Sequence, residues 1–569
     1  MNHRVLIALT AMLPLTACAT VPRQAAAPVE VQILAFNDFH GNLEPPGLTI
    51  VAADGEVPAG GAAYLASALK QVRTAHSVTV AAGDLIGASP LISSLFLDEP
   101  TIDAMNAMGL DLSAVGNHEF DRGAAELRRM QVGGCEKYTP RIPCRIERFG
   151  GARFEFLAAN VFGPDGKTIF PGTAVREVGG IRIGFVGMAL RDTPTMVVPS
   201  GVAGLRFADE VETANAAARE LSARGASTVV LLIHQGGSIA GRFDDQACPG
   251  LDGAILPIVA ALDPAIGLVV SGHTHNAYIC HLPLAGGGER LLTSSGKYGT
   301  LVADIRLSFA GGRLATEKAG FVIVQGAAIA NAKQAVPLSA THLVFAADPA
   351  VAAIVARYRA ASAAEGERVV GHLGGVAPMG NDSGESAAAA VVADSMWFAT
   401  RAPAAGRADF ALTNSGGART DLIPGPEGAV TFAQITALEP FANRLVTKTL
   451  TGAQVKAVLE QSFDSGTNSA ARPIVLIPSA NVRFEFDRSR AAGERVTRII
   501  IDGRSIDPAA RYRVTVPSFL SDGGDNFTRL RDGTEPVEGG GDLEAMEAWL
   551  ATSPPAPPKG RARDVTPTP

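Results

Sequence analysis

The sequence predicts an α/β protein with two domains joined by a helix. Three observations predict this class. Five short apolar runs rich in valine and isoleucine are separated by helix-length segments, an alanine-rich stretch follows them, and a second α/β unit begins after that stretch. At 569 residues, with 47% hydrophobic residues, the chain is long enough to bury two substantial cores.

Each of the five apolar runs ends in residues that bind metal ions. The runs and the motifs that follow them are Val31–Phe36 before Asn37-Asp38-Phe39-His40-Gly41, Ser77–Ala82 before Gly83-Asp84, Leu110–Val115 before Gly116-Asn117-His118-Glu119, Thr228–Ile233 before His234, and Ile266–Val270 before Ser271-Gly272-His273-Thr274-His275. Such runs are typical of strands in one sheet covered on both faces, where ligands bind at the carboxyl ends of the strands. We therefore expect the five motifs to converge on one metal site.

The number of donors indicates two metal ions. Seven side chains offer oxygen or nitrogen: Asp38, His40, Asp84, Asn117, His234, His273 and His275. A four- to six-coordinate ion cannot use them all, and Asp84 is the expected bridge, holding one ion with each carboxylate oxygen. Because no cysteine is among the donors, Mn²⁺, Zn²⁺, Mg²⁺, Fe or Co suits the site. Two such ions about 3.5–4 Å apart activate water and clamp the oxygens of an in-line displacement, which indicates phosphoester hydrolysis. The alternatives are isolated core or surface histidines, and helix caps at Asp38 and Asp84.

These blocks, in this order and spacing, resemble the calcineurin-like binuclear metallophosphoesterases. Gly116-Asn117-His118-Glu119-Phe120-Asp121 and the whole second half resemble the bacterial 5′-nucleotidases of the UDP-sugar hydrolase type, over roughly residues 30 to 535. The resemblance implies an N-terminal α/β domain of the metallophosphoesterase β-sandwich type and a C-terminal α/β domain of the 5′-nucleotidase type. It assigns one metal to Asp38, His40, Asp84 and His275, and the other to Asp84, Asn117, His234 and His273.

His118 and Asp121 form the catalytic dyad that the resemblance implies. His118 would face the substrate and stabilise the transition state or protonate the leaving oxygen. The spacing supports this pair independently, because residues i and i+3 share a helix face and the carboxylate can orient the imidazole. Phe39, between two ligands, should point away from the metals. We expect Glu119 to be a structural hydrogen-bonding residue.

The second domain carries the substrate residues that the resemblance implies. Phe441 and Phe519 would sandwich the base, and each good stacking contact stabilises binding by about 1–3 kcal/mol. Asn414 would contact the base, Asp525 the sugar and Arg419 the phosphate side. Taken by composition alone, each phenylalanine is more typical of a hydrophobic core. Relatives usually place an arginine shortly before Gly384-Glu385-Ser386, but residues 371–390 contain no Arg or Lys, which leaves the preferred substrate open.

The N-terminus resembles a bacterial lipoprotein signal. A short basic region precedes the apolar segment Val5–Leu15, and Leu15-Thr16-Ala17-Cys18 resembles a lipoprotein cleavage box, so Cys18 would be lipidated and anchor the enzyme to a membrane in the periplasm. The alternative is an ordinary signal cut after Ala19. Of the remaining four cysteines, the sequence-local pairs Cys135–Cys144 and Cys248–Cys280 are the expected disulfides of an exported protein, with free buried thiols as the alternative.

The expected domain organisation follows from these segments. We predict a signal peptide over residues 1–18, a tether over 19–30, a metallophosphoesterase domain over 31–335, a linker over 336–368 with a helix at Asp348–Ala364, a substrate-binding domain over 369–550, and a disordered proline-rich tail over 551–569.

The favoured function is an exported, metal-dependent 5′-nucleotidase, in which a metal-activated hydroxide converts nucleoside 5′-monophosphates to nucleoside and phosphate. The first alternative is a hydrolase with another substrate: a 2′,3′-cyclic nucleotide phosphodiesterase, a UDP-sugar or dinucleotide pyrophosphatase, or a sulfur-ester hydrolase. The second alternative is a lipoprotein that binds nucleosides without turnover. The net charge of −7, with no long basic stretch, argues against a nucleic-acid polymer as partner. No protein partner is evident.

Overall fold

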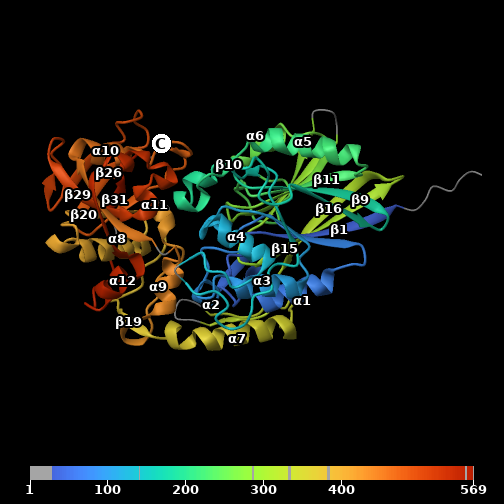
Figure 1. Ribbon diagram of the computed structural model, residues 1–569, viewed down its shortest axis with the longest axis horizontal. Coiled ribbons are helices and arrows are strands. Elements are labelled where there is room, and N and C mark those ends of the chain that lie inside the picture. Colours follow the sequence, from blue (N-terminus) through green and yellow to red (C-terminus); the bar gives the residue numbers. More distant parts are fainter. Residues whose placement is uncertain are drawn as a thin grey trace, which may run out of the picture.

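The computed structural model describes residues 28–567 except 140, 285–287, 331–334, 381–384, 442 and 558–559. Two lobes lie side by side, an N-terminal lobe in blue to yellow and a C-terminal lobe in orange to red (Figure 1). The predicted signal segment, Cys18 and Gly384 lie outside the described residues. No helix within the described part of the chain is both long and apolar enough to cross a bilayer.

Two six-stranded sheets form the centre of the N-terminal lobe. The first has the order β16-β15-β1-β4-β5-β6 and the second β13-β14-β12-β11-β9-β8. The strands of the first are β1 (Val29–Phe36), β4 (Ser77–Ala81), β5 (Leu112–Ala114), β6 (Glu155–Leu157), β15 (Leu301–Ala310) and β16 (Arg313–Ile323). Those of the second are β8 (Thr173–Val178), β9 (Ile181–Met188), β11 (Thr228–Ile233), β12 (Ile266–Ser271), β13 (Ala277–Pro283) and β14 (Glu289–Ser295).

The two sheets pack face to face, as expected for a β-sandwich. Their inner faces share one buried cluster, with Val31 and Ile33 from the first sheet and Phe185 and Val230 from the second. All five predicted strands are confirmed, but the expectation of one sheet is wrong: β1, β4 and β5 are parallel neighbours in the first sheet, whereas β11 and β12 pair in the second. The apolar runs indicate only that both faces of each strand are buried. Strands are buried in this way in two packed sheets with helices outside, as well as in one sheet between helices.

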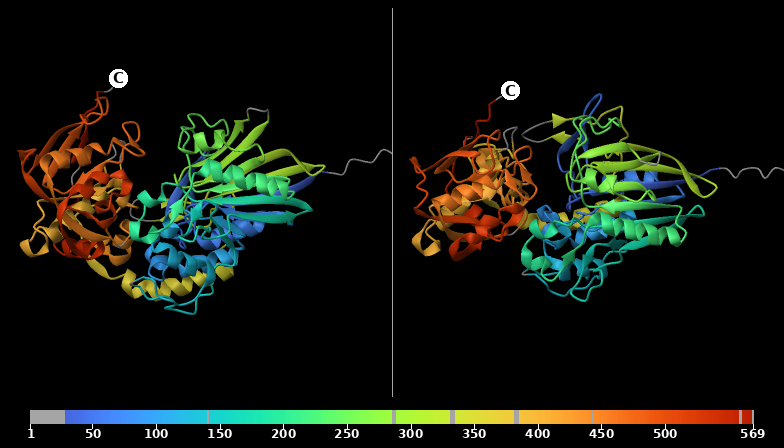
Figure 2. Two further views of the ribbon diagram at one scale, coloured as in Figure 1. Left: turned by 45° about the horizontal axis from the view of Figure 1, so that its top comes forward. Right: turned by 90° about the horizontal axis from the view of Figure 1, so that it is seen from above.

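Helices cover the outer faces of the sandwich (Figure 2). On the first sheet lie α1 (Ala62–Val72), α2 (Leu91–Ser94), α3 (Glu99–Met108) and α4 (Gly123–Val132), and on the second lie α5 (Glu210–Ala223) and α6 (Ile255–Ala260). Their buried residues form separate clusters from the one between the sheets. The small ribbons of this lobe are β2 (Leu48–Ala52) with β3 (Gly55–Ala59), β7 (Val161–Phe162) with β10 (Arg206–Phe207), and β17 (Ile329–Ala330) with β18 (Ala335–Val336).

The predicted connecting helix is confirmed as α7 (Pro349–Gly366). Asp348 caps its N-terminus by accepting the backbone N–H groups of Ala350 and Val351, and Pro349 occupies the first turn, where the missing N–H costs nothing. The helix packs against α1 and α3 of the first lobe and α9 (Phe432–Leu438) of the second, so it joins the two lobes along one side (Figure 1).

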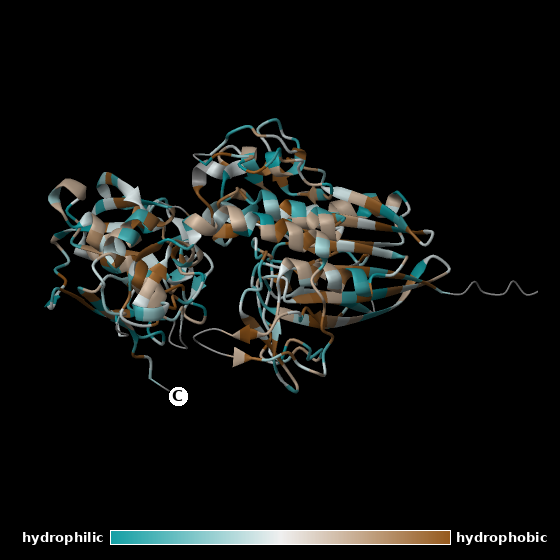
Figure 3. Cartoon of the chain, turned by 90° about the horizontal axis from the view of Figure 1, so that it is seen from below, coloured by the Kyte–Doolittle hydropathy of each residue, from teal (hydrophilic) through white to brown (hydrophobic). Residues whose placement is uncertain are grey.

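The C-terminal lobe contains a five-stranded and a four-stranded sheet, of order β25-β20-β29-β22-β30 and β28-β27-β26-β31. Hydrophobic segments, in brown, alternate with hydrophilic ones, in teal, along the strands of both lobes (Figure 3). The strands are β20 (Phe410–Asn414), β22 (Arg444–Thr451), β25 (Leu476–Pro478), β26 (Val482–Phe486), β27 (Val496–Ile501), β28 (Arg504–Ser505), β29 (Arg511–Pro517), β30 (Thr534–Gly541) and β31 (Ala562–Asp564). The helices are α8 (Ala387–Thr400), α10 (Gly452–Glu460), α11 (Ser518–Ser521) and α12 (Asp542–Leu550), and short ribbons are β19 (Val369–His372) with β21 (Ala429–Thr431) and β23 (Asp464–Ser465) with β24 (Asn468–Ser469).

The prediction of a disordered tail is wrong for the described residues after 551. Strand β31 pairs in parallel with β26. Arg561 is only 2% exposed and forms two 2.8 Å hydrogen bonds with the carboxylate of Asp394 in α8. The Glu385 carboxylate accepts the backbone N–H groups of Gly560 and Arg561. The proline-rich composition gave no indication that the buried ion pair of Arg561 with Asp394 and the pairing of β31 with β26 order this segment.

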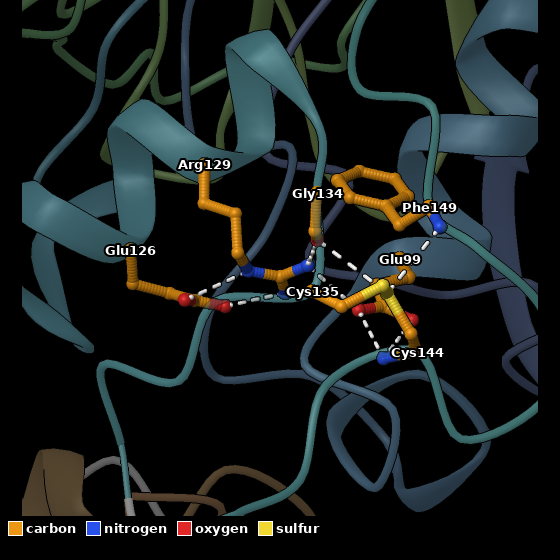
Figure 4. Close-up of a disulfide and its surroundings, with 7 residues drawn as sticks. All are labelled: Glu99, Glu126, Arg129, Gly134, Cys135, Cys144 and Phe149. Atoms are coloured by element: carbon orange, nitrogen blue, oxygen red, sulfur yellow. Dashed lines mark hydrogen bonds and ion pairs between the residues drawn. A yellow bond between two sulfur atoms is a disulfide. The ribbon is translucent and has the colours of Figure 1, made fainter.

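Both predicted disulfides are confirmed, as Cys135–Cys144 and Cys248–Cys280. The first closes a loop after α4, where the N–H of Cys144 donates to Glu99, the first residue of α3 (Figure 4). Arg129 forms ion pairs with Glu99 at 2.8 Å and with Glu126 at 2.7 Å. The disulfide loop is therefore attached to the N-terminus of α3.

Candidate metal centre and substrate cleft

The loops that follow the strands of both sheets bring the predicted ligands together. Two groups of side chains have ligand atoms within 4.8 Å of one another: Asp38 with His40 and His275, and Asp84 with His234 and His273. In the first group, the Nε2 atoms of His40 and His275 are 3.1 Å apart, and Nε2 of His275 is 3.4 Å from Oδ1 of Asp38.

The second group includes Asn117 as predicted. Oδ1 of Asn117 lies 3.1 Å from Nε2 of His234 and 3.1 Å from Nδ1 of His273. Nε2 of His234 is 3.0 Å from Oδ2 of Asp84. All seven predicted donors therefore lie in two adjacent groups.

Asp84 lies between the two groups, but through a single oxygen. Its Oδ2 atom is 3.0 Å from His234 and 3.6 Å from Nε2 of His40, whereas Oδ1 accepts the backbone N–H of His118 at 2.9 Å. The expectation that each oxygen would hold one ion stays a prediction, because Oδ1 keeps a second lone pair beside the N–H of His118. The sequence showed the carboxylate but gave no information about which oxygen the His118 amide would occupy.

Backbone carbonyls orient two of the imidazoles. Nδ1 of His40 donates to the carbonyl of Gly87 at 2.9 Å, and Nδ1 of His234 donates to the carbonyl of Ala82 at 2.8 Å. Each bond fixes the tautomer and leaves Nε2 free to bind a cation.

The electrostatics of the groups favour cations. Burial lowers the pKa of His40, of His275 and, to about 3, of His273, so these rings are neutral donors. Burial opposes ionisation of Asp84, but His234 and the neighbouring histidines hold the pKa of this carboxyl well below its ordinary value. Burial lowers the pKa of His234, but the carboxylate of Asp84 outweighs this effect and raises it to about 10. Carboxylate, amide and imidazole donors in two adjacent groups fit hard or borderline divalent cations.

Five of the seven candidate ligands have left-handed backbone conformations. Their φ angles are +49° for Asp38, +47° for His40, +51° for Asp84, +71° for His273 and +59° for His275. Non-glycine residues rarely adopt this region, and such strain is concentrated at functional sites. The tight turns after the strands bring ligands that are adjacent in sequence onto one centre.

The predicted dyad is present beside the second group. Nδ1 of His118 is 2.9 Å from Oδ2 of Asp121. Burial lowers the pKa of His118, but the carboxylates of Asp121 and Asp84 outweigh this effect and raise it above its ordinary value. Glu119 accepts the backbone N–H groups of Asp84 and Gly116, which is the structural role expected for it. Phe39 is fully buried in the hydrophobic cluster under α1, away from the ligands.

The C-terminal lobe completes a cleft in front of the dyad. A cavity of about 290 Å³ is lined by His118, Asp121, Asn117 and His273 and by all five predicted substrate residues, Asn414, Arg419, Phe441, Phe519 and Asp525. The ring of Phe441 stacks beside His118, with centroids 6.1 Å apart and an interplanar angle of 22°. Nδ2 of Asn414 donates to Asp525 at 2.6 Å. Burial raises the pKa of Asp525 to about 6.

Among the residues that were not predicted are Asn443, in the cleft, and Tyr298, beside the first ligand group. Asn443 lines the cavity, and its Oδ1 atom accepts the N–H of Phe519 at 3.3 Å, which links the loop of Phe441 to α11. Tyr298 packs its ring 6.0 Å from His40 and 5.9 Å from His275. Tyr298 follows the apolar strand β14, so the rule that found the ligands also applied to it. Asn443 carried no such signal.

The fold and the paired histidine and carboxylate groups define a two-domain phosphoester hydrolase with two candidate metal sites. The family model described as 5′-nucleotidase, C-terminal domain matches residues 369–532. A probable 5′-nucleotidase from Treponema pallidum is 27% identical over 595 residues, which cover 93% of this chain and 92% of that protein. The crystal structure of a 5′-nucleotidase precursor from Thermus thermophilus matches with a TM-score of 0.75 and 25% identity, over 95% of this chain and 100% of that one.

An uncharacterized protein from Acinetobacter calcoaceticus is 51% identical over 174 residues, which are 28% of this chain and 85% of that protein. The chain belongs to the calcineurin-like 5′-nucleotidase family. This confirms the family and the two-domain α/β class that the strand-end motifs indicated.

Proposed function

We propose that the protein is an exported, metal-dependent 5′-nucleotidase that hydrolyses nucleoside 5′-monophosphates to nucleoside and phosphate. The observation that carries this proposal is the common cleft, in which the dyad and candidate ligands of one lobe face aromatic and polar side chains of the other. Aromatic faces suit a base, and a guanidinium beside histidines and carboxylates suits a phosphoryl group.

The residues have distinct roles in this proposal. Asp38, His40, Asp84 and His275 would hold one divalent ion, and Asp84, Asn117, His234 and His273 the other. When bound, the two ions supply water activation and charge stabilisation at phosphorus. His118, held by Asp121, donates a hydrogen bond or a proton to the phosphoryl or leaving oxygen, and Arg419 fixes the phosphoryl group.

Phe441 and Phe519 orient the nucleoside, Asn414 contacts the base, and Asp525 binds the ribose hydroxyls. Lipidation at Cys18 and a periplasmic location are part of the same proposal. The two disulfides support an oxidising compartment.

A second cavity supports a second candidate, a UDP-sugar or dinucleotide pyrophosphatase. A space of about 460 Å³ is lined by Asn42, Lys297, Tyr298 and Arg419, and Arg419 also lines the base cleft. A substrate that continues beyond its first phosphate therefore has room on the other side of Arg419. A cation at Lys297 would partly compensate for the arginine missing before Gly384.

Phosphate release from a panel of substrates tests these proposals. AMP, UMP, 2′,3′-cyclic AMP, UDP-glucose and bis-p-nitrophenyl phosphate are compared for wild type and His118→Ala, before and after chelation and Mn²⁺ addition. We expect monophosphates to be preferred, chelation to abolish turnover, and His118→Ala to lower kcat by about 10²- to 10⁴-fold. Chelator-insensitive turnover, or equal rates for the two proteins, would contradict the proposed function, whereas preference for UDP-glucose would favour the second candidate.

A further inference from the structure

One peptide unit, between Gly87 and Ala88, contacts both halves of the candidate site. Its carbonyl oxygen accepts Nδ1–H of His40 at 2.9 Å. Its N–H, on Ala88, donates to Oδ2 of Asp121 at 3.1 Å. The same carboxylate oxygen lies 2.9 Å from Nδ1 of His118. Because a peptide unit is planar and rigid, the orientation of this single group sets the positions of a candidate metal ligand and of the dyad together.

The packing around Gly87 leaves no room for a side chain. Gly87 has a φ of +81°, and a Cβ atom there would overlap the carbonyl oxygen of His118 and lie 2.8 Å from Oδ2 of Asp121. A glycine is therefore required for the close approach. Glycine is also the most flexible residue, so the orientation of the peptide must be fixed by other contacts.

Asp98 supplies a charged contact to the preceding peptide unit, between Ile86 and Gly87, and this contact fixes the position of Gly87. Its side chain is fully buried, and Oδ2 accepts the N–H of Gly87 at 3.3 Å while pairing with the guanidinium of Arg122. Oδ1 accepts the hydroxyl of Ser93 at 2.7 Å. Asp98 itself has a left-handed backbone, with φ of +63°, at the start of α3. Three donors thus hold one carboxylate against the segment that reaches the site.

We propose that Asp98, paired with Arg122, is a positioning residue for the reaction. It holds the Ile86–Gly87 peptide unit and so fixes the position of Gly87. The carbonyl of Gly87 and the N–H that follows it then orient both His40 and the His118–Asp121 dyad. This inference rests on the proposed function for the role of the dyad.

The negative charge of Asp98 is essential to this arrangement. Two donors, the Gly87 N–H and the Arg122 guanidinium, converge on one oxygen. An asparagine in this place has one acceptor oxygen and one NH₂ group, so either the pair of donors from Gly87 and Arg122 or the hydroxyl of Ser93 loses its acceptor. The peptide would then turn, and loss of such an indirect contact to a metal ligand typically costs 10- to 100-fold in metal affinity or activity.

The neighbouring residue provides a matched control. Glu99 is 2% exposed and pairs with Arg129 at 2.8 Å, in the same turn as Asp98, but its carboxylate contacts Cys144 in the disulfide loop (Figure 4). Asp98→Asn and Glu99→Gln each remove one buried charge, and both should lower Tm. We expect Asp98→Asn to lower kcat per folded enzyme by about 10- to 100-fold with KM changed less than about threefold, and Glu99→Gln to leave kcat unchanged. Equal kcat values for the two variants would overturn the proposal.

A double-mutant cycle separates positioning from a general loss of structure. If Asp98 acts through the dyad, Asp98→Asn should cost less than about threefold in kcat at saturating Mn²⁺ in a His118→Ala background, because that route is already broken. The same large factor in both backgrounds would contradict action through the dyad. The effect of Asp98 on His40 is measured without turnover, as the Mn²⁺ affinity found by calorimetric titration. The two proteins compared are His118→Ala and His118→Ala with Asp98→Asn. We expect a 10- to 100-fold weaker affinity for one ion, and unchanged affinity would contradict an effect on His40.

Two further arms keep the test decisive. Should Asp98→Asn not fold, Ser93→Ala removes one donor to the carboxylate, and we expect it to lower kcat by about two- to fivefold with unchanged KM; full activity would overturn the proposal. Should wild type not hydrolyse nucleotides, the proposed function fails, but the same comparisons with bis-p-nitrophenyl phosphate and the Mn²⁺ titration still test the role of Asp98.

Discussion

Replacement of Arg561 should lower the unfolding free energy of the C-terminal lobe. The guanidinium makes two 2.8 Å hydrogen bonds to Asp394 and one of 3.1 Å to the carbonyl of Pro478, and both charged side chains are buried. Arg561→Met would leave the Asp394 carboxylate with one neutral partner, the N–H of Ala480. Because removal of one member of a buried pair leaves an uncompensated charge, we expect a loss of about 3–5 kcal/mol in unfolding free energy.

Tryptophan fluorescence in urea measures this loss selectively. The chain has two tryptophans, and both belong to the C-terminal lobe: Trp397 lies one turn after Asp394 in α8, and Trp549 lies in α12. Arg563→Met is the matched control, because Arg563 lies only two residues after Arg561, in β31. Its side chain is 68% exposed and pairs loosely with Glu485, so its loss should cost at most about 1 kcal/mol.

A double variant distinguishes an unpaired charge from a detached tail. Arg561→Met with Asp394→Leu removes both charges, and such replacements are often neutral, so stability should largely return. If Arg561→Met destabilises the lobe no more than Arg563→Met does, the buried ion pair does not hold the tail and the reasoning is refuted.

The remaining predictions concern the cleft and the cross-links. Phe519→Ala should raise KM for nucleotides by about 5- to 140-fold, the equivalent of 1–3 kcal/mol of stacking, without changing KM for ribose 5-phosphate; equal effects on both would exclude stacking. Burial raises the pKa of Glu439 well above its ordinary range and that of Asp542 to about 7. The folded protein therefore holds protons that the unfolded chain releases, and stability should fall as pH rises from about 4 to 7. Glu439→Gln should raise Tm at pH 8 but not at pH 4; no pH-dependent difference would contradict this. Joint replacement of Cys248 and Cys280, which are 32 residues apart, by alanine should cost about 3–4 kcal/mol in urea unfolding, and an unchanged midpoint would argue against the cross-link.

The site was more predictable from the sequence than the arrangement of the sheets. Each ligand directly follows an apolar strand, so strand periodicity and ligand chemistry located Asp38, Asp84 and His234 together. The same periodicity reports only that both faces of a strand are buried. It cannot distinguish one sheet covered by helices from two sheets packed on each other, and for this reason β11 and β12 were placed in the wrong sheet.

Long-range polar contacts account for the other differences. The partner of Arg561 is 167 residues away in sequence, and Asn443 acts on Phe519, 76 residues away. Neither contact produces a periodic pattern in the sequence. A proline-rich segment in which a single arginine is buried has the same composition as a disordered segment. The single-oxygen position of Asp84 likewise depends on an amide that no pattern of residues specifies.

The left-handed backbone of the candidate ligands is held by the fold that surrounds it. Five left-handed residues at about 1–3 kcal/mol each amount to about 5–15 kcal/mol, which equals the net stability of a typical domain. Such strain persists only where the surroundings over-determine it, and each of these residues follows a strand whose final residues are fully buried. The rings of His40 and His275 also turn their Nε2 atoms toward each other at 3.1 Å. Two neutral imidazoles can hold that contact as one N–H···N hydrogen bond, and a cation beside both nitrogens would instead give each lone pair a partner. Cation binding should therefore stabilise the folded N-terminal lobe without rearranging it, because the cost of the geometry is already met by the two packed sheets.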